Sequence, residues 1–113
     1  MKAEVKLILS NDTTDEASWR ASDPANHSHW FSVDIGPVGE DSCDIFQVCV
    51  ATPLAIRDRR IKRPPFKGLV LDRFAMNSAK RLIRNHVASK SAPTWEGLVE
   101  QLRETMSWEY DRA

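Results

Sequence analysis

The strongest indication of the fold comes from residues 29–50, HWFSVDIGPVGEDSCDIFQVCV. Apolar and polar side chains alternate on both sides of a Gly-Pro-Val-Gly break at residues 36–39. Because successive side chains of a strand point to opposite faces, this pattern predicts two half-buried strands joined by a hairpin loop of more than two residues. The residues expected to face the core are Phe31, Val33, Ile35, Phe46, Val48 and Val50.

Two further segments extend the sheet predicted from this hairpin. Residues 2–9 (KAEVKLIL) alternate in the same way, and the side chains expected on the core face are Ala3, Val5, Leu7 and Leu9. Residues 10–28 carry turn and capping residues without a sustained period, so we expect a long connection with one helical turn near residues 15–20. Residues 68–74 (GLVLDRF) are short and apolar, which predicts a fourth and more central strand.

The second half of the chain predicts helices. Thr52 is placed to start a short helix over residues 54–61. Apolar residues recur at helical spacing within residues 75–90 and again after Thr94, whose side chain is placed to cap the last helix. Together these elements predict one α+β domain over residues 1–113: an antiparallel sheet of about four strands with two C-terminal helices packed on one face.

Two tryptophans near the C-terminus are expected to be structural. Trp95 shares the apolar stripe of the last predicted helix with Leu98 and Leu102. Trp108, together with Tyr110, is placed to fasten the C-terminus onto the sheet.

The composition is that of an ordinary globular protein: 42% hydrophobic, 28% charged and formally neutral overall. No apolar run approaches the roughly 20 residues needed to span a bilayer, and the N-terminus lacks the apolar core of a signal peptide. Cys43 and Cys49 share the parity of one predicted strand about 20 Å apart, which is too far for them to bridge each other. We therefore expect a cytoplasmic protein with no membrane association.

The sequence offers little that would support catalysis or a bound metal. His27 and His29 lie two residues apart without a matching second pair of ligands. His86 falls on the apolar stripe of a predicted helix, where a hydrogen-bonded structural role is the simpler interpretation. No Ser or Cys occupies a nucleophile elbow, and no glycine-rich run is placed to cradle a phosphate. We therefore expect no enzyme activity, no metal site and no cofactor.

Charge is distributed unevenly along the chain. Residues 11–46 contain eight acids and one base, whereas residues 57–90 contain eleven bases and two acids. Such asymmetry usually concerns partners rather than the fold. The acidic part places Glu40, Asp41 and Asp44 on the predicted hairpin, although a turn needs only glycine and proline.

This acidic hairpin, with Trp30 and Asp34 on its outward face, is a candidate for a protein–protein contact. Trp30 alternates with Phe31 and so points away from the core, where it is exposed unless residues 10–28 or a helix cover it. Tryptophan anchors interfaces, and charged groups steer the encounter of two proteins. A catalytic role for the hairpin carboxylates is not expected, because an exposed hairpin lacks the burial that tunes their pKa values.

The basic part supports an alternative, a small nucleic-acid-binding accessory domain that uses residues 57–90. Its densest stretch, RDRRIKRPPFK at residues 57–67, contains Arg57, Arg59, Arg60, Lys62 and Arg63. Clustered arginine and lysine suit phosphate contacts. Zero net charge and the lack of the aromatic pair found on RNA-recognition sheets count against this alternative, so nucleic acid is not the expected partner.

Several short motifs, taken in order, resemble the immunity protein 8 family. They are MKAEVKLI at the N-terminus, DP-x-N from Asp23, IGPVGE from Ile35, D-x-F-x-V-C from Asp44, TWEGLVEQL from Thr94 and WEYD from Trp108. The resemblance runs nearly end to end, and its specificity lies in the order and spacing of the motifs. The chain departs from the family pattern after Thr52-Pro53, where Leu54 follows in place of a tryptophan.

The resemblance implies a small bacterial cytosolic protein encoded beside a polymorphic or contact-dependent toxin. Such a protein binds its cognate toxin C-terminal domain stoichiometrically and without catalysis, so that the producing cell or its siblings survive. The resemblance carries over no toxin-contact residues, so the candidate contacts remain those proposed from the residues above. A nuclease toxin has a basic cleft that an acidic hairpin would block, whereas a toxin of another kind would suit the basic stretch. A stress-related domain without a toxin partner is a third hypothesis.

Overall fold

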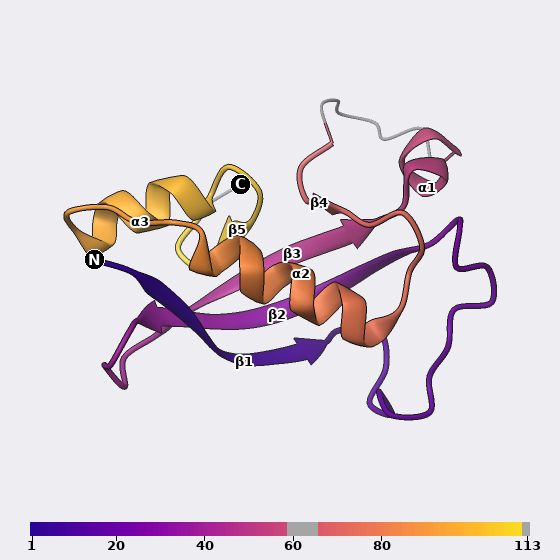
Figure 1. Cartoon of the computed structure of the whole chain (residues 1–113), viewed down its shortest axis with the longest axis horizontal. Coiled ribbons are helices and arrows are strands. Elements are labelled where there is room, and N and C mark those ends of the chain that lie inside the picture. Colours follow the sequence, from indigo (N-terminus) through magenta and orange to yellow (C-terminus); the bar gives the residue numbers. More distant parts are fainter. Residues whose placement is uncertain (59–65, 112–113) are drawn as a thin grey trace.

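A computed structural model of the chain, which describes residues 1–58 and 66–111, is built around one sheet (Figure 1). In chain order the elements are β1 (Ala3–Ser10), β2 (Ser28–Pro37), β3 (Asp44–Ala51), α1 (Pro53–Asp58), β4 (Leu69–Val70), α2 (Met76–Ala88), α3 (Trp95–Leu102) and β5 (Ser107–Trp108). The strand order is β1-β2-β3-β4, and β5 also pairs with β3. Because β1, β2 and β3 are antiparallel neighbours accompanied by helices, the predicted α+β class is confirmed.

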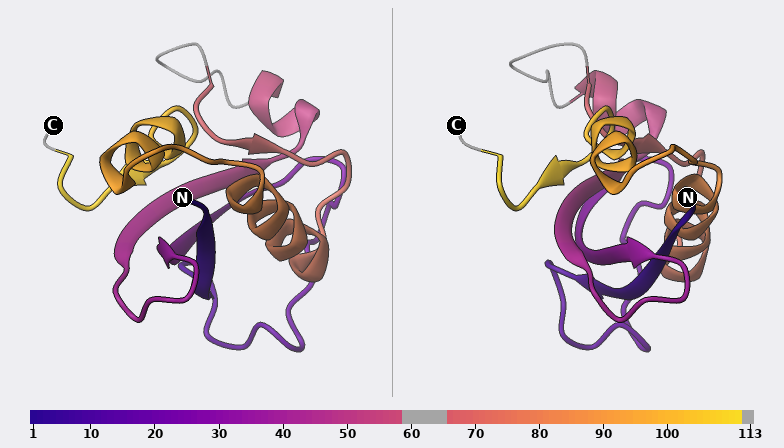
Figure 2. Two further views of the ribbon diagram at one scale, coloured as in Figure 1. Left: turned by 60° about the vertical axis from the view of Figure 1, so that its left-hand side comes forward. Right: turned by 90° about the vertical axis from the view of Figure 1, so that its left-hand side faces the viewer.

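The core lies between one face of the sheet and the helices α2 and α3. All six residues predicted to face inward from the two hairpin arms are fully buried. They belong to one hydrophobic cluster with Ile83 and Val87 of α2 and with Leu98 and Leu102 of α3. Figure 1 shows α2 in front of β1 and β2, and Figure 2 shows the same layers from two further sides. The prediction that two C-terminal helices pack on one face is therefore confirmed.

The two longer helices begin close to where the sequence places them. α2 follows Ala75, which provides no side-chain cap, so its stability depends on the buried stripe through Met76, Ala79, Ile83 and Val87. α3 is capped as predicted, because the Gly97 N–H donates to the Thr94 hydroxyl oxygen at 3.1 Å. Within residues 1–58 and 66–111, no helix has the length and apolar character needed to cross a membrane.

β1 differs from its expected pattern because it contains a bulge. Val5 pairs with Ile35, but Leu7 pairs with Asp34, the very next residue of β2. Lys6 is therefore an extra residue on β1, with no partner of its own in the ladder.

The bulge reverses which face each later side chain of β1 points to. Ile8 is buried, whereas Leu7 and Leu9, which were expected in the core, are exposed. That prediction was wrong because a bulge is set by contacts with the rest of the fold and not by local alternation. The Lys6 ammonium supplies such contacts, since it donates to two carbonyl oxygens of the hairpin loop at 3.2 and 2.5 Å.

The edge of the sheet beyond β3 also differs from expectation. Segment 68–74, predicted as a central strand, contributes only the two residues of β4, which run parallel to the end of β3. The start of β3 pairs instead with β5, where Trp108 lies opposite Phe46. The same edge is thus divided between two short strands, so the sheet is mixed and β4 cannot be central. The prediction that Trp108 fastens the C-terminal segment to the sheet is confirmed.

α1 covers a small part of the face of the sheet opposite α2 and α3. Ala55 of α1 forms a second cluster with Cys49 and Ala51 of β3, against which Phe66 also packs. α1 begins directly after Thr52, as predicted, and the Ile56 N–H donates to the Thr52 carbonyl oxygen at 3.0 Å. The predicted continuation of this helix over residues 59–61 lies outside the described residues.

Candidate functional site

Trp30 and Asp34 lie on the face of the sheet that α2 and α3 leave uncovered. Because Phe31, Val33 and Ile35 point into the core, the residues that alternate with them along β2 point the other way. Trp30 is 45% exposed, so neither residues 10–28 nor a helix covers it. Its backbone N–H donates to Oδ2 of Asp12 at 3.1 Å, which holds a further acid next to β2.

Glu40 and Asp41 occupy the exposed tip of the hairpin. The chain turns at Gly39, whose φ of +84° favours glycine, and the Glu40 N–H donates to the Pro37 carbonyl oxygen at 3.2 Å. In the described part of the chain, the carboxylates of Glu40 and Asp41 have no hydrogen-bond or ion-pair partner. The turn therefore presents two unneutralised acids to solvent.

Asp44 lies at the base of the hairpin and has different surroundings. Its Oδ2 accepts hydrogen bonds from the indole Nε1 of Trp95 at 3.1 Å and of Trp108 at 3.0 Å. These bonds connect the start of β3 to α3 and to β5. A hollow of about 310 Å³ next to Asp44 is also lined by Glu40 and Cys43. The structure therefore gives Asp44 a role in holding elements together, which the two acids at the tip do not have.

Only one residue of the predicted basic patch falls in the described part of the chain. Arg57 is exposed near the end of α1, and its Nε donates to Oδ1 of Asp58 at 3.1 Å. Asp58 also accepts a hydrogen bond from the Asn26 side chain. The remaining members, Arg59, Arg60, Lys62 and Arg63, lie outside the described residues. The basic patch therefore stays a prediction.

His29 of β2 points to the same side of the sheet as Phe31, into the protein interior. It is fully buried, and its ring is hydrogen-bonded to the Ser10 hydroxyl at 2.6 Å and to His27 at 3.1 Å. Burial lowers the pKa of His29, although the nearby charges of Asp12 and Glu16 oppose the shift. The environment thus favours the neutral imidazole, and the rings of neighbouring aromatic side chains pack around it.

His86 has the structural role that its place on the α2 stripe predicted. Its Nε2 is hydrogen-bonded to the Thr105 hydroxyl at 2.9 Å, which connects α2 to the turn after α3. Burial lowers the pKa of His86 as well, and the charge of Lys90 acts in the same direction. Among the described residues, no three His, Cys, Asp or Glu side chains are arranged to hold a metal ion.

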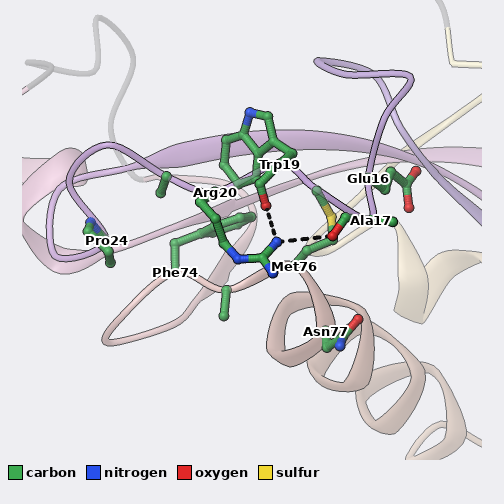
Figure 3. Close-up of a pocket in the computed structure, with 10 residues that line it drawn as sticks. Glu16, Ala17, Trp19, Arg20, Pro24, Phe74, Met76 and Asn77 are labelled. Atoms are coloured by element: carbon green, nitrogen blue, oxygen red, sulfur yellow. Dashed lines mark hydrogen bonds between the residues drawn. The ribbon is translucent and has the colours of Figure 1, made fainter.

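A pocket of about 550 Å³ lies between the 10–28 connection and the start of α2 (Figure 3). Trp19 and Phe74 form part of its apolar wall. The Arg20 guanidinium donates to two carbonyl oxygens of its own loop, at 3.1 and 2.8 Å. Glu16 is paired with Lys80 of α2, and although burial opposes it, this hydrogen bond helps to lower the pKa of Glu16. The Glu16–Lys80 pair thus holds the connection against α2, whereas Arg20 stabilises the connection itself.

Three exposed apolar residues on the face that carries Trp30 were not predicted from the sequence as candidate contacts. Leu7, Leu9 and Ile45 are exposed there, and Leu7, Asp34 and Ile45 are direct neighbours across β1, β2 and β3. One signal was present in the sequence: residues 7–9 are apolar at three successive positions, which strict alternation does not explain. Because three successive apolar residues place side chains on both faces of β1, the run indicates that at least one of them is exposed. It does not indicate which face is buried.

Comparison with known proteins identifies one family. A family model described as Immunity protein 8 matches residues 3–112, nearly the whole chain. No curated protein and no solved structure matches the chain.

Proposed function

The chain belongs to the Immunity protein 8 family, and we propose that it is a non-catalytic inhibitor that binds a cognate bacterial toxin domain. By neutralising that domain in the cytoplasm, it protects the cell that produces the toxin. The observation that carries this proposal is the match of the family model over residues 3–112, which leaves almost no part of the chain outside the family. Immunity proteins act against toxins, so a stoichiometric inhibitor is the simplest activity for the whole chain.

The exposed acids and the exposed tryptophan are the contacts that we propose for the toxin. Trp30 and Asp34 point outward from β2, and Glu40 and Asp41 extend from the hairpin without neutralising partners in the described part of the chain. A large exposed aromatic ring suits an interface anchor, and unneutralised carboxylates attract a basic partner from a distance. We assign Asp44 to holding the hairpin base, because its Oδ2 is already bound by two indole groups.

The chemistry of these groups favours a toxin domain with a basic contact surface. A nuclease fits this description, because its cleft must attract nucleic-acid phosphates. Acids presented by the inhibitor would compete for the same cleft and would also raise the rate of association.

The direct test uses the toxin C-terminal domain encoded by the adjacent gene. The purified domain is assayed for its toxic activity while this protein is added in increasing amounts. We expect the activity to fall to zero at a one-to-one ratio, because an inhibitor acts stoichiometrically and is not consumed. Full toxin activity in the presence of excess protein would contradict the proposal.

A second assay separates this function from nucleic-acid binding. The protein is titrated against generic duplex DNA and single-stranded RNA at low and at physiological salt. An immunity protein should show almost no binding at either salt concentration. Binding at low salt that weakens steeply as salt is added would instead support the nucleic-acid alternative, because phosphate contacts release counterions.

A further inference from the structure

Among residues 1–58 and 66–111, one face of the sheet is covered by helices and the other is largely uncovered. α2 and α3 pack on the covered face, and in Figure 1 the uncovered face lies behind the sheet. On the uncovered face, α1 shields only the end of β3 around Cys49 and Ala51. An antiparallel sheet with one face in water normally places polar side chains on that face.

The uncovered face of this sheet is instead rich in large apolar side chains. Leu7 is 46% exposed, Leu9 51%, Trp30 45% and Ile45 43%. They come from three adjacent strands, which lie about 4.8 Å apart, and polar Asp34 and Ser32 lie between them on β2. Large apolar side chains that gather on one exposed face, interspersed with polar groups, are typical of an interaction site.

The bulge at Lys6 is what places the two leucines on this area. Without the extra residue, alternation from Val5 would carry Leu7 and Leu9 into the core. The fold therefore exposes two leucine side chains to solvent, and the hydrogen bonds from Lys6 to the hairpin stabilise this arrangement. Bulges are often found where a side chain is redirected for a function.

A closed polar network lies within the same area. Ser32 donates to Asn11 at 2.7 Å, Asn11 donates to Gln47 at 2.6 Å, and Gln47 donates to Ser32 at 2.9 Å. Because these side chains hold one another in place, the surface loses little conformational freedom when a partner covers it. The area thus combines apolar anchors with ordered polar groups, as the buried part of a protein interface does.

The charge on and around this area is acidic. Asp34 lies between Leu7 and Ile45, Asp12 is bonded to the Trp30 backbone, and Glu109 accepts a hydrogen bond from the Ile45 N–H at 3.0 Å. Lys6, at the border, is paired with Glu4 and offsets little of this charge. A partner that covers the area must bring basic groups to these carboxylates, because an unpaired buried charge is costly.

We propose that the toxin domain binds to this uncovered face, and that the toxin presents to it an apolar patch bordered by basic residues. The contacts that we propose on this face are Leu7, Leu9, Trp30, Ile45 and Asp34. This inference rests on the proposed function and adds the location and chemistry of the interface. The hairpin acids Glu40 and Asp41 lie at one end of the same hairpin and steer the encounter, whereas the apolar face supplies most of the affinity.

The test compares binding of the toxin domain to wild-type protein and to a set of variants by calorimetry or surface plasmon resonance. The double variant Leu7→Glu/Leu9→Glu changes the uncovered face and adds negative charge without touching the core. Its matched control is Arg81→Gln/Arg84→Gln, which lowers the net charge by the same amount through two exposed positions on α2. We expect the leucine variant to raise Kd by about 30-fold or more and the arginine variant to leave it within about threefold.

Two single variants keep the test decisive if the double variant does not fold by circular dichroism. Trp30→Ala removes the anchor, and we expect it to raise Kd by about 30-fold. Asp34→Lys reverses the central charge, and we expect it to slow association and to reduce the dependence of the association rate on salt.

The outcomes separate the two proposals. Tight wild-type binding that is lost in the face variants and kept in the α2 variant supports the inference. Tight binding that persists in folded face variants overturns the inference and leaves the immunity function standing. Wild-type association that does not respond to salt overturns the basic character assigned to the toxin. Failure of the wild-type protein to bind overturns the proposed function and this inference with it.

Discussion

Trp95 and Trp108 donate their indole N–H groups to the same atom, Oδ2 of Asp44, at 3.1 and 3.0 Å. One tryptophan belongs to α3 and the other to β5, and the carboxylate lies at the first residue of β3. A single acid on the descending arm of the hairpin therefore holds a helix and the C-terminal strand against the sheet. Glu40 and Asp41 at the hairpin tip have no such partners in the described part of the chain. Acids that are close together in sequence therefore have different structural roles.

This relationship predicts that Asp44 matters for stability and that Asp41 does not. Asp44→Ala removes the shared acceptor and leaves two partly buried indole N–H groups without it, so we expect the free energy of unfolding to fall by about 1–3 kcal/mol. Asp41→Ala, three residues earlier in the chain and exposed, should change it by less than about 0.5 kcal/mol. Urea unfolding of both variants measures the difference. Equal stabilities would contradict the structural role of Asp44.

The ring of Trp95 should contribute more to stability than its hydrogen bond does. Trp95 packs against the core while remaining partly exposed. Trp95→Phe keeps most of the packing and loses the bond to Asp44, so we expect a cost of about 1 kcal/mol. Trp95→Ala loses both, and we expect about 3 kcal/mol, the lower end of the range for a large aromatic residue. Thermal unfolding followed by circular dichroism compares them, and an unchanged melting temperature in Trp95→Ala would contradict the assignment.

Gly36, near the end of β2, is predicted to be less replaceable than Gly39 in the hairpin loop. A Cβ at Gly36 would lie 1.9 Å from the carbonyl oxygen of Ser42, which is backbone and cannot rotate away. At Gly39 the space is open and only the positive φ opposes a side chain. We expect Gly36→Ala to cost about 3 kcal/mol and Gly39→Ala about 1–2 kcal/mol, measured by urea unfolding. The reverse order would show that the loop closes differently.

Buried His29 and half-buried His86 predict a stability that falls as the pH drops below about 6.5. Burial lowers the folded-state pKa of both His29 and His86, so the unfolded chain takes up protons first as the pH falls. The stabilisation is therefore present above the unfolded pKa and is lost as the pH falls toward the folded pKa. Carboxylates with lowered pKa values, such as Glu4 and Asp111, act at lower pH, outside this window.

The double variant His29→Gln/His86→Gln tests this prediction. Its free energy of unfolding, measured by urea at about pH 7.5 and about pH 5.5, should change less with pH than that of the wild-type protein. A similar decrease in both proteins would assign the pH dependence to other groups.

The sequence predicted the parts of the fold that depend on local pattern. Alternation along both hairpin arms identified the buried residues of β2 and β3, and Thr94 identified the start of α3. The outward direction of Trp30 followed from the same alternation, whereas its exposure also depended on whether residues 10–28 or a helix covered it. These features are decided by neighbours along the chain.

The parts that the sequence did not predict depend on contacts between distant segments. The bulge in β1 requires Lys6 to reach the hairpin loop, more than thirty residues away, so the exposed positions of Leu7 and Leu9 could not be deduced from alternation. β4 is short because it runs parallel to β3 only over the last two residues of that strand, while β5 pairs with the start of the same edge. The role of Asp44 depends on two tryptophans that lie 51 and 64 residues further along the chain.

An NMR titration of this protein with its toxin domain, using methyl-labelled leucine and isoleucine, tests whether the toxin binds the uncovered face of the sheet. We expect the signals of Leu7, Leu9 and Ile45, together with the Trp30 indole signal, to shift or broaden as the toxin is added. Leu98 and Leu102, buried on the covered face, serve as internal controls and should change little. A saturated complex in which the signals of the uncovered face are unchanged would show that the toxin binds elsewhere on the protein.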